Sequence, residues 1–126
     1  MSASPRWMTA GAVVCLVTLV AIVSGDLFVP AARNTEVWFG FEVTGWPAIL
    51  TAPVHWAIFA VGAWAFWTGR RRALTWAAAY LFYVALSHLV WSEASPHGRG
   101  WPIGLLQAAV FSTVAVLILR QRARVE

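Results

Sequence analysis

Lysine is absent from the sequence, because all nine basic residues are arginines. This excludes chemistry that needs a lysine Schiff base, including that of retinal proteins of the usual kind. Cysteine is nearly absent, and the single Cys15 cannot form an intrachain disulfide, which excludes quinone-linked disulfide chemistry. Charged residues make up only 11% of the chain, against about 25% in an ordinary soluble domain. A soluble nucleic-acid binder is therefore excluded, and the sequence also lacks a glycine-rich phosphate-binding loop.

Long apolar runs dominate instead, with 60% hydrophobic residues and a mean hydropathy of +0.70. A helix needs about 20 apolar residues to cross a bilayer. Four runs meet this condition and predict membrane helices at 8–24, 47–68, 73–91 and 101–119, with an outer loop over 25–46. The first run also ends in small residues, as a signal peptide does, but its length favours a retained helix. The pattern predicts an all-α fold: one integral membrane domain over 1–126, an antiparallel four-helix bundle.

The arginines are distributed unevenly between the two sides of this bundle. Two of them, Arg33 and Arg99, fall on the side of the outer loop. The other seven fall on the opposite side, and they are Arg6, Arg70, Arg71, Arg72, Arg120, Arg122 and Arg124. Because cytoplasmic loops carry the excess of basic residues, both termini are predicted to be cytoplasmic. The sequence therefore indicates a multi-pass protein of the cell (inner) membrane.

Two histidines, His55 and His88, lie inside the second and third predicted helices at nearly matched depth. Ionisable side chains inside a membrane are costly and are often functional. Three interpretations stay open for them: hydrogen bonding across helices, axial ligation of a haem or pigment, and proton relay. A zinc site would need a third ligand from Glu42, Glu93 or His97, but no short-spaced metal motif is present, and no metal or cofactor is predicted.

Four of the five acidic residues gather on the outer side, at Asp26, Glu36, Glu42 and Glu93. For most of them the simple interpretation is an outer loop in contact with water. Glu42 is set among aromatic and apolar residues, so we expect desolvation to raise its pKa and keep it a neutral acid. This makes Glu42 the candidate general acid, with Asp26 or Glu93 as a second carboxylate and His55 and His88 positioning or relaying protons.

Nine tryptophans are present in 126 residues. Many of them fit ordinary interfacial belts or lipid-facing positions. Helical spacing also permits an aromatic-walled cavity, and the predicted lining residues are Trp38, Phe41, Trp56, Phe59 and Trp91. Aromatic faces stabilise cations, so such a cavity suits a polyene or an epoxide that a carboxylic acid protonates.

These features predict a cofactor-independent membrane enzyme that cyclises, isomerises or opens the epoxide of an isoprenoid- or lipid-like substrate. One alternative is a haem- or pigment-binding membrane subunit that uses His55 and His88. The other is a non-catalytic accessory subunit of a membrane complex. The expected partners are an apolar small molecule and the lipid bilayer, without nucleic acid. Both a homo-oligomer and a larger membrane complex are compatible with the sequence.

Overall fold

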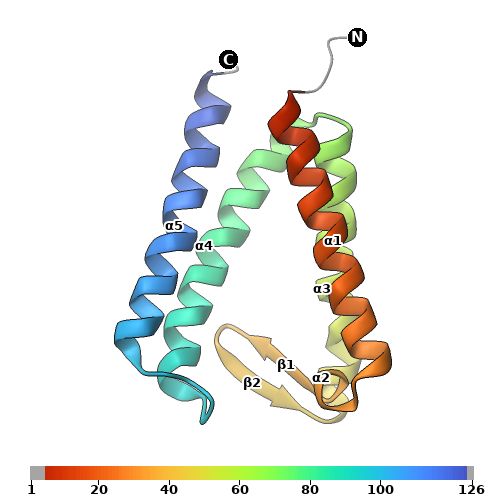
Figure 1. Ribbon diagram of the computed structural model, residues 1–126, viewed down its shortest axis with the longest axis vertical. Helices are drawn as coiled ribbons and strands as arrows, with labels where there is room; N and C mark the ends of the chain where they lie inside the picture. The colour runs from red at the N-terminus through yellow and green to blue at the C-terminus, as the bar shows by residue number, and fades with distance from the viewer. Residues whose placement is uncertain (1–4, 125–126) are drawn as a thin grey trace. The chain divides into compact units, whose positions relative to one another are not determined.

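A computed structural model describes residues 5–124 of the chain. The elements follow in the order α1 (Arg6–Phe28), α2 (Pro30–Arg33), β1 (Thr35–Trp38), β2 (Phe41–Thr44), α3 (Trp46–Trp67), α4 (Arg71–Ala94) and α5 (Trp101–Arg124) (Figure 1). Within the described residues, α1, α3, α4 and α5 are long and apolar enough to cross a membrane. The prediction of a mostly helical chain with four candidate membrane spans is therefore confirmed.

The chain divides into two compact units, and the described part of the first contains residues 5–36 and 44–73. In this unit α1 and α3 pack side by side and run in opposite directions (Figure 1). Small residues allow the close approach. A Cβ atom on Gly11 would lie 2.9 Å from the ring of Phe66, and one on Gly62 would lie 3.2 Å from Cys15 Sγ. Glycine thus replaces side-chain bulk along the α1–α3 contact, as is common between membrane helices.

The second unit contains residues 37–43 and 74–126, of which those to 124 are described. Its helices α4 and α5 meet where Gly104 faces Ser92, since a Cβ on Gly104 would lie 2.7 Å from both Ser92 Cβ and Oγ. Further along the same contact, the rings of His88 and Phe111 stack with centroids 5.0 Å apart. The start of α5 is fixed by Glu93 Oε1, which accepts a hydrogen bond of 2.5 Å from the backbone N–H of Trp101. A carboxylate at a helix N-terminus also interacts favourably with the helix dipole.

Most of the predicted outer loop over 25–46 has regular structure. Helix α1 extends to Phe28, four residues beyond the predicted end at residue 24. Pro30 has no N–H with which to continue the helical hydrogen bonds. Arg33 supplies donors in its place, with Nε 3.0 Å from the Asp26 carbonyl oxygen and a terminal guanidinium nitrogen 2.8 Å from that of Leu27. A cation thereby caps the C-terminal end of α1, where the dipole favours positive charge.

A two-stranded sheet, β1 and β2, follows α2 as a hairpin. The two residues between the strands, Phe39 and Gly40, have φ angles of 54° and 87°. Positive φ at both positions is the geometry of a type I′ turn, whose twist matches that of the flanking strands. The sequence signal was available as two short runs rich in β-branched and aromatic residues on either side of a two-residue Phe-Gly turn. The prediction of an outer loop over 25–46 did not include either strand.

Candidate functional site

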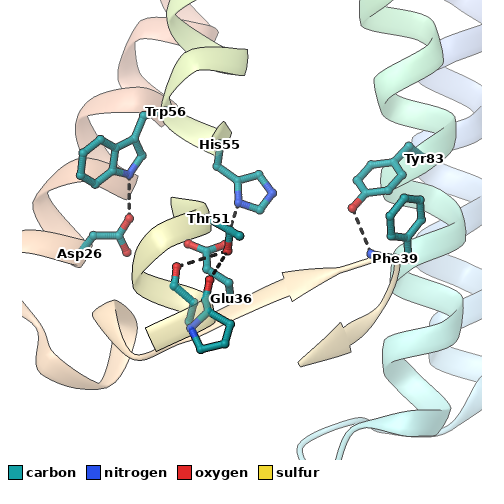
Figure 2. A network of polar contacts seen from close by, with 9 residues as sticks. Asp26, Glu36, Phe39, Thr51, His55, Trp56 and Tyr83 are labelled. Atoms are coloured by element: carbon teal, nitrogen blue, oxygen red, sulfur yellow. Dashed lines mark hydrogen bonds and ion pairs between the residues drawn. The ribbon is translucent and has the colours of Figure 1, made fainter. Parts of the chain in front are cut away.

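The first unit contains a hydrogen-bonded carboxylate–imidazole pair. Glu36 lies in β1 and His55 lies in α3, and His55 Nδ1 is 2.7 Å from Glu36 Oε2 (Figure 2). The two side chains are only 9% and 15% exposed, respectively. When the Glu36 carboxylate accepts this hydrogen bond, Nδ1 of His55 is the donor, and in the neutral form of such an imidazole Nε2 carries the lone pair. A shielded pair of this kind fixes the orientation and the tautomer of the imidazole.

A second carboxylate is held by the next residue of α3. Trp56 Nε1 donates a hydrogen bond of 2.7 Å to Oδ2 of Asp26, which is a buried residue in the last turn of α1 (Figure 2). Successive helical residues point about 100° apart. His55 and Trp56 can therefore reach carboxylates on two different elements, β1 and α1. At this end of the first unit, His55 and Trp56 of α3 thus connect the helix to β1 and to α1.

An apolar groove lies between α1 and α3 beside this pair of contacts. Its volume is about 510 Å³, and Trp56 contributes to its wall. The remaining lining residues are small or aliphatic, and they are Leu19, Val20, Val23, Ser24, Ala57 and Ala60. The groove therefore suits a hydrocarbon chain, and the indole that lines it is the one that binds Asp26.

The second unit places Glu42 at the C-terminal end of α4. Glu42 Oε1 accepts hydrogen bonds from Trp91 Nε1 at 2.9 Å and from Ser95 Oγ at 2.6 Å. The imidazole of His97 lies 3.3 Å from the same oxygen and is 75% exposed, whereas the Glu42 side chain is 19% exposed. Trp91 lies in the last turn of α4, and Ser95 directly follows this helix with its N–H bonded to the Trp91 carbonyl at 3.0 Å, so the two side chains project to the same side. Glu42 therefore fastens β2 to the end of this helix.

These contacts overturn the expected protonation of Glu42. Hydrogen bonds from Ser95, then Trp91 and then His97 lower the pKa of Glu42 below its ordinary value and outweigh the effect of desolvation. Donors that point at a carboxylate stabilise its charged form. The prediction of a raised pKa was wrong because sequence neighbours suggested an apolar setting, whereas the actual partners are 49 to 55 residues away.

The turn of the hairpin also belongs to the second unit and contacts α4. The backbone N–H of Phe39 donates a hydrogen bond of 3.0 Å to the Tyr83 hydroxyl, and the two rings meet edge to face at 5.2 Å (Figure 2). A Cβ on Gly40 would lie 2.6 Å from the Ser87 carbonyl oxygen and 2.5 Å from Val90 Cβ. The turn is thus held by both hydrogen bonding and close packing against one face of α4.

The other predicted site residues are divided between the two units. His55, Trp56 and Phe59 belong to the first, and Trp38, Phe41, His88, Trp91 and Glu93 belong to the second. Of the predicted cavity residues, Trp56 lines the groove described above. Glu93 caps α5 and His88 stacks on Phe111, so both take part in the packing of the second unit. Glu36 is the residue that sequence reasoning passed over, because a lone acid in an outer loop usually faces water.

Among residues 5–124, no group of three or more histidine, cysteine, aspartate or glutamate side chains is arranged to hold a metal ion. No protein-family model matches the chain, and no match is found among curated proteins or among solved structures.

Proposed function

We propose that the four apolar helices form an antiparallel bundle in the cell (inner) membrane, with both termini in the cytoplasm. The support is the arginine distribution, seven residues against two, together with the four candidate spans. In this orientation the turn between α3 and α4 is cytoplasmic. Asp26, the hairpin and the start of α3 then lie toward the outer side.

We further propose that the protein carries out acid–base chemistry on an apolar, isoprenoid- or lipid-like substrate. The observation that supports this most strongly is the shielded Glu36–His55 pair, with 2.7 Å between Oε2 and Nδ1. Imidazole both accepts and donates protons near neutral pH, and a carboxylate on Nδ1 directs that exchange to Nε2. A cyclisation or isomerisation of a polyene requires this kind of proton delivery and removal.

The neighbouring groups would divide the remaining work. The groove between α1 and α3 would hold the hydrocarbon chain, and its Trp56 wall would stabilise developing positive charge. Asp26, bonded to the edge of that indole, would make the ring face more electron-rich and orient it. Glu42 would keep the hairpin docked on α4, because its ionised carboxylate is a better anchor than a proton donor.

The test compares wild-type protein with Glu36→Gln and His55→Gln after incubation with an apolar extract of host membranes. The expected result is a new lipid product with the wild type and at least a hundredfold less product with either variant, consistent with typical general acid–base contributions of about 10²–10⁴-fold. His97→Gln is the matched control, because that imidazole is 75% exposed. Product formation at the wild-type rate by both variants would overturn the proposal, provided that all proteins elute as folded particles.

A second candidate function is supported by one observation, the carboxylate on His55 Nδ1. Histidines that ligate a metal centre usually donate their other ring N–H to a carboxylate or carbonyl. His55 is oriented in this manner, so axial ligation of a haem or pigment is the rival proposal. An absorption spectrum of protein purified from its native host would show a chromophore band that His55→Ala abolishes. A spectrum that contains only tryptophan absorption would eliminate this rival, and absence of product as well would favour an accessory subunit.

A further inference from the structure

A second apolar groove lies between α1 and α3, close to the start of α1 and the end of α3. Its volume is about 310 Å³. Helix α1 contributes Ala12, Val13 and Leu16, and α3 contributes Ala63, Trp64 and Trp67. The two tryptophans are 52% and 69% exposed. The groove is therefore an open apolar channel with an aromatic wall, and it is distinct from the groove that Trp56 lines.

A cation contacts one of the aromatic rings that line this groove. The guanidinium carbon of Arg70 lies 4.4 Å from the centre of the Trp64 ring, which is the geometry of a cation–π interaction. Trp64 itself lines the groove. Trp64 therefore connects the two, because the same ring lines the apolar groove and contacts the Arg70 guanidinium.

The backbone holds Arg70 in this position. Helix α3 ends in a Schellman motif, in which Gly69 has a φ of 67°, Gly69 N–H bonds the Phe66 carbonyl at 3.1 Å and Arg70 N–H bonds the Ala65 carbonyl at 3.0 Å. These hydrogen bonds determine where the Arg70 side chain begins. The backbone of Arg70 is thus fixed by hydrogen bonds, and its contact with Trp64 places the guanidinium.

The local charge is strongly positive. Arg71 and Arg72 follow Arg70 directly in the sequence. The two acidic residues described in this unit, Asp26 and Glu36, belong to the last turn of α1 and to β1. Asp26 is ten residues beyond Leu16 along α1, or about 15 Å at 1.5 Å per residue. Both described carboxylates of this unit therefore lie toward the other end of α1, away from Arg70.

We propose that this groove is a binding site for an anionic phospholipid. The phosphate would lie against the Arg70 guanidinium, with Arg71 and Arg72 adding to the positive field, and one acyl chain would lie along the wall formed by Trp64 and Trp67. Charge complementarity favours this occupant over a neutral lipid, because the Trp64 ring that lines the apolar groove also contacts the Arg70 guanidinium. A cluster of cytoplasmic arginines beside a membrane helix attracts acidic headgroups in the same way. The site is independent of the proposed acid–base chemistry.

The experiment uses the full chain in detergent, exchanged into equal amounts of phosphatidylglycerol and phosphatidylcholine with identical acyl chains. Bound lipid is counted by native mass spectrometry after mild delipidation. The wild type is expected to retain phosphatidylglycerol in preference to phosphatidylcholine, and Arg70→Gln to reduce that preference about fivefold, the effect of about one basic residue at an anionic surface. Arg99→Gln, an exposed arginine in the turn before α5, is the matched control and should leave the preference unchanged.

Two further arms separate the possible sources of binding. Val13→Trp fills the groove with a larger side chain and should release both lipids. Excess inorganic phosphate should displace little lipid, because the acyl chain in the groove contributes to the binding affinity. An unchanged lipid preference in Arg70→Gln would overturn the proposal. Complete displacement by inorganic phosphate would also overturn it, in favour of a simple phosphate site. Arg70→Gln changes an exposed side chain, so the central comparison does not depend on whether Val13→Trp folds.

Discussion

His55 Nδ1 lies 2.7 Å from Glu36 Oε2, and the next residue along α3, Trp56, donates a hydrogen bond to Asp26. Two consecutive side chains of one helix thus hold carboxylates from a strand and from another helix. Each carboxylate is largely withdrawn from solvent. Because a buried charge without a partner is costly, each contact stabilises its element only while both partners are present.

The first prediction concerns this pair. Glu36→Leu should lower the free energy of unfolding by about 1–2 kcal/mol, because the imidazole loses its acceptor in a poorly solvated place. Unfolding in mixed micelles that contain a denaturing detergent measures the effect. His55→Leu and the double variant complete a double-mutant cycle, which measures the coupling energy between the two side chains. We expect the double variant to be less destabilised than the sum of the single changes, and strictly additive effects would show that the two side chains are not coupled.

The second prediction concerns pH and Glu42. The folded-state pKa of Glu42 is lowered by its hydrogen bonds to Ser95, Trp91 and His97. A lowered carboxyl pKa contributes stability that is present above the unfolded-state value of about 4.3 and is lost as the pH falls through the folded-state value. Hairpin docking should therefore weaken as the pH falls from about 4.3 through the folded-state pKa of Glu42, seen as faster hydrogen exchange of the hairpin amides.

Glu42→Gln separates this effect from general acid unfolding. The amide remains neutral, so its hairpin docking should be weaker than the wild type at neutral pH and should not weaken further through the same acid range. His97→Gln should retain most of the wild-type pH response, because Ser95 and Trp91 still donate to Glu42. An identical acid transition in the wild type and in Glu42→Gln would contradict the assignment.

The helices could be predicted from the sequence because hydropathy over about 20 residues is a strong local signal. The partners of Glu42 could not be predicted, since Trp91 and Ser95 are 49 and 53 residues away and nothing in the local sequence indicates the docking. Glu36 was overlooked for the same reason, because its role depends on the position of His55. The hairpin was predicted only as part of an outer loop, because strands of four residues give a weak local signal between polar and turn-forming residues.

The third prediction uses two glycines of the hairpin region. Gly40 and Gly45 both have positive φ, at 87° and 73°, and any L-residue would be strained there. A Cβ on Gly40 would also collide with Val90 and the Ser87 carbonyl, whereas one on Gly45 would meet nothing within 4 Å. Gly45→Ala should cost about 1–3 kcal/mol from backbone strain alone. Gly40→Ala should cost more and should expose the hairpin amides to hydrogen exchange, and equal effects would contradict the close contact with α4.

The fourth prediction concerns the end of α1. Arg33 donates to two successive carbonyls, those of Asp26 and Leu27, at a point where Pro30 cannot. Arg33→Gln should destabilise this helix end by about 1–2 kcal/mol. The substitution removes the hydrogen bonds that the charged guanidinium donates to the two carbonyls, and it removes the favourable interaction of that charge with the helix dipole. Arg33→Lys keeps the charge but not the fork of donors, so it should recover only part of the loss. Hydrogen exchange of the amides of residues 25–28 measures the effect, with Arg99→Gln as the control. Full recovery by lysine would mean that charge alone stabilises the helix end and that the paired hydrogen bonds contribute little.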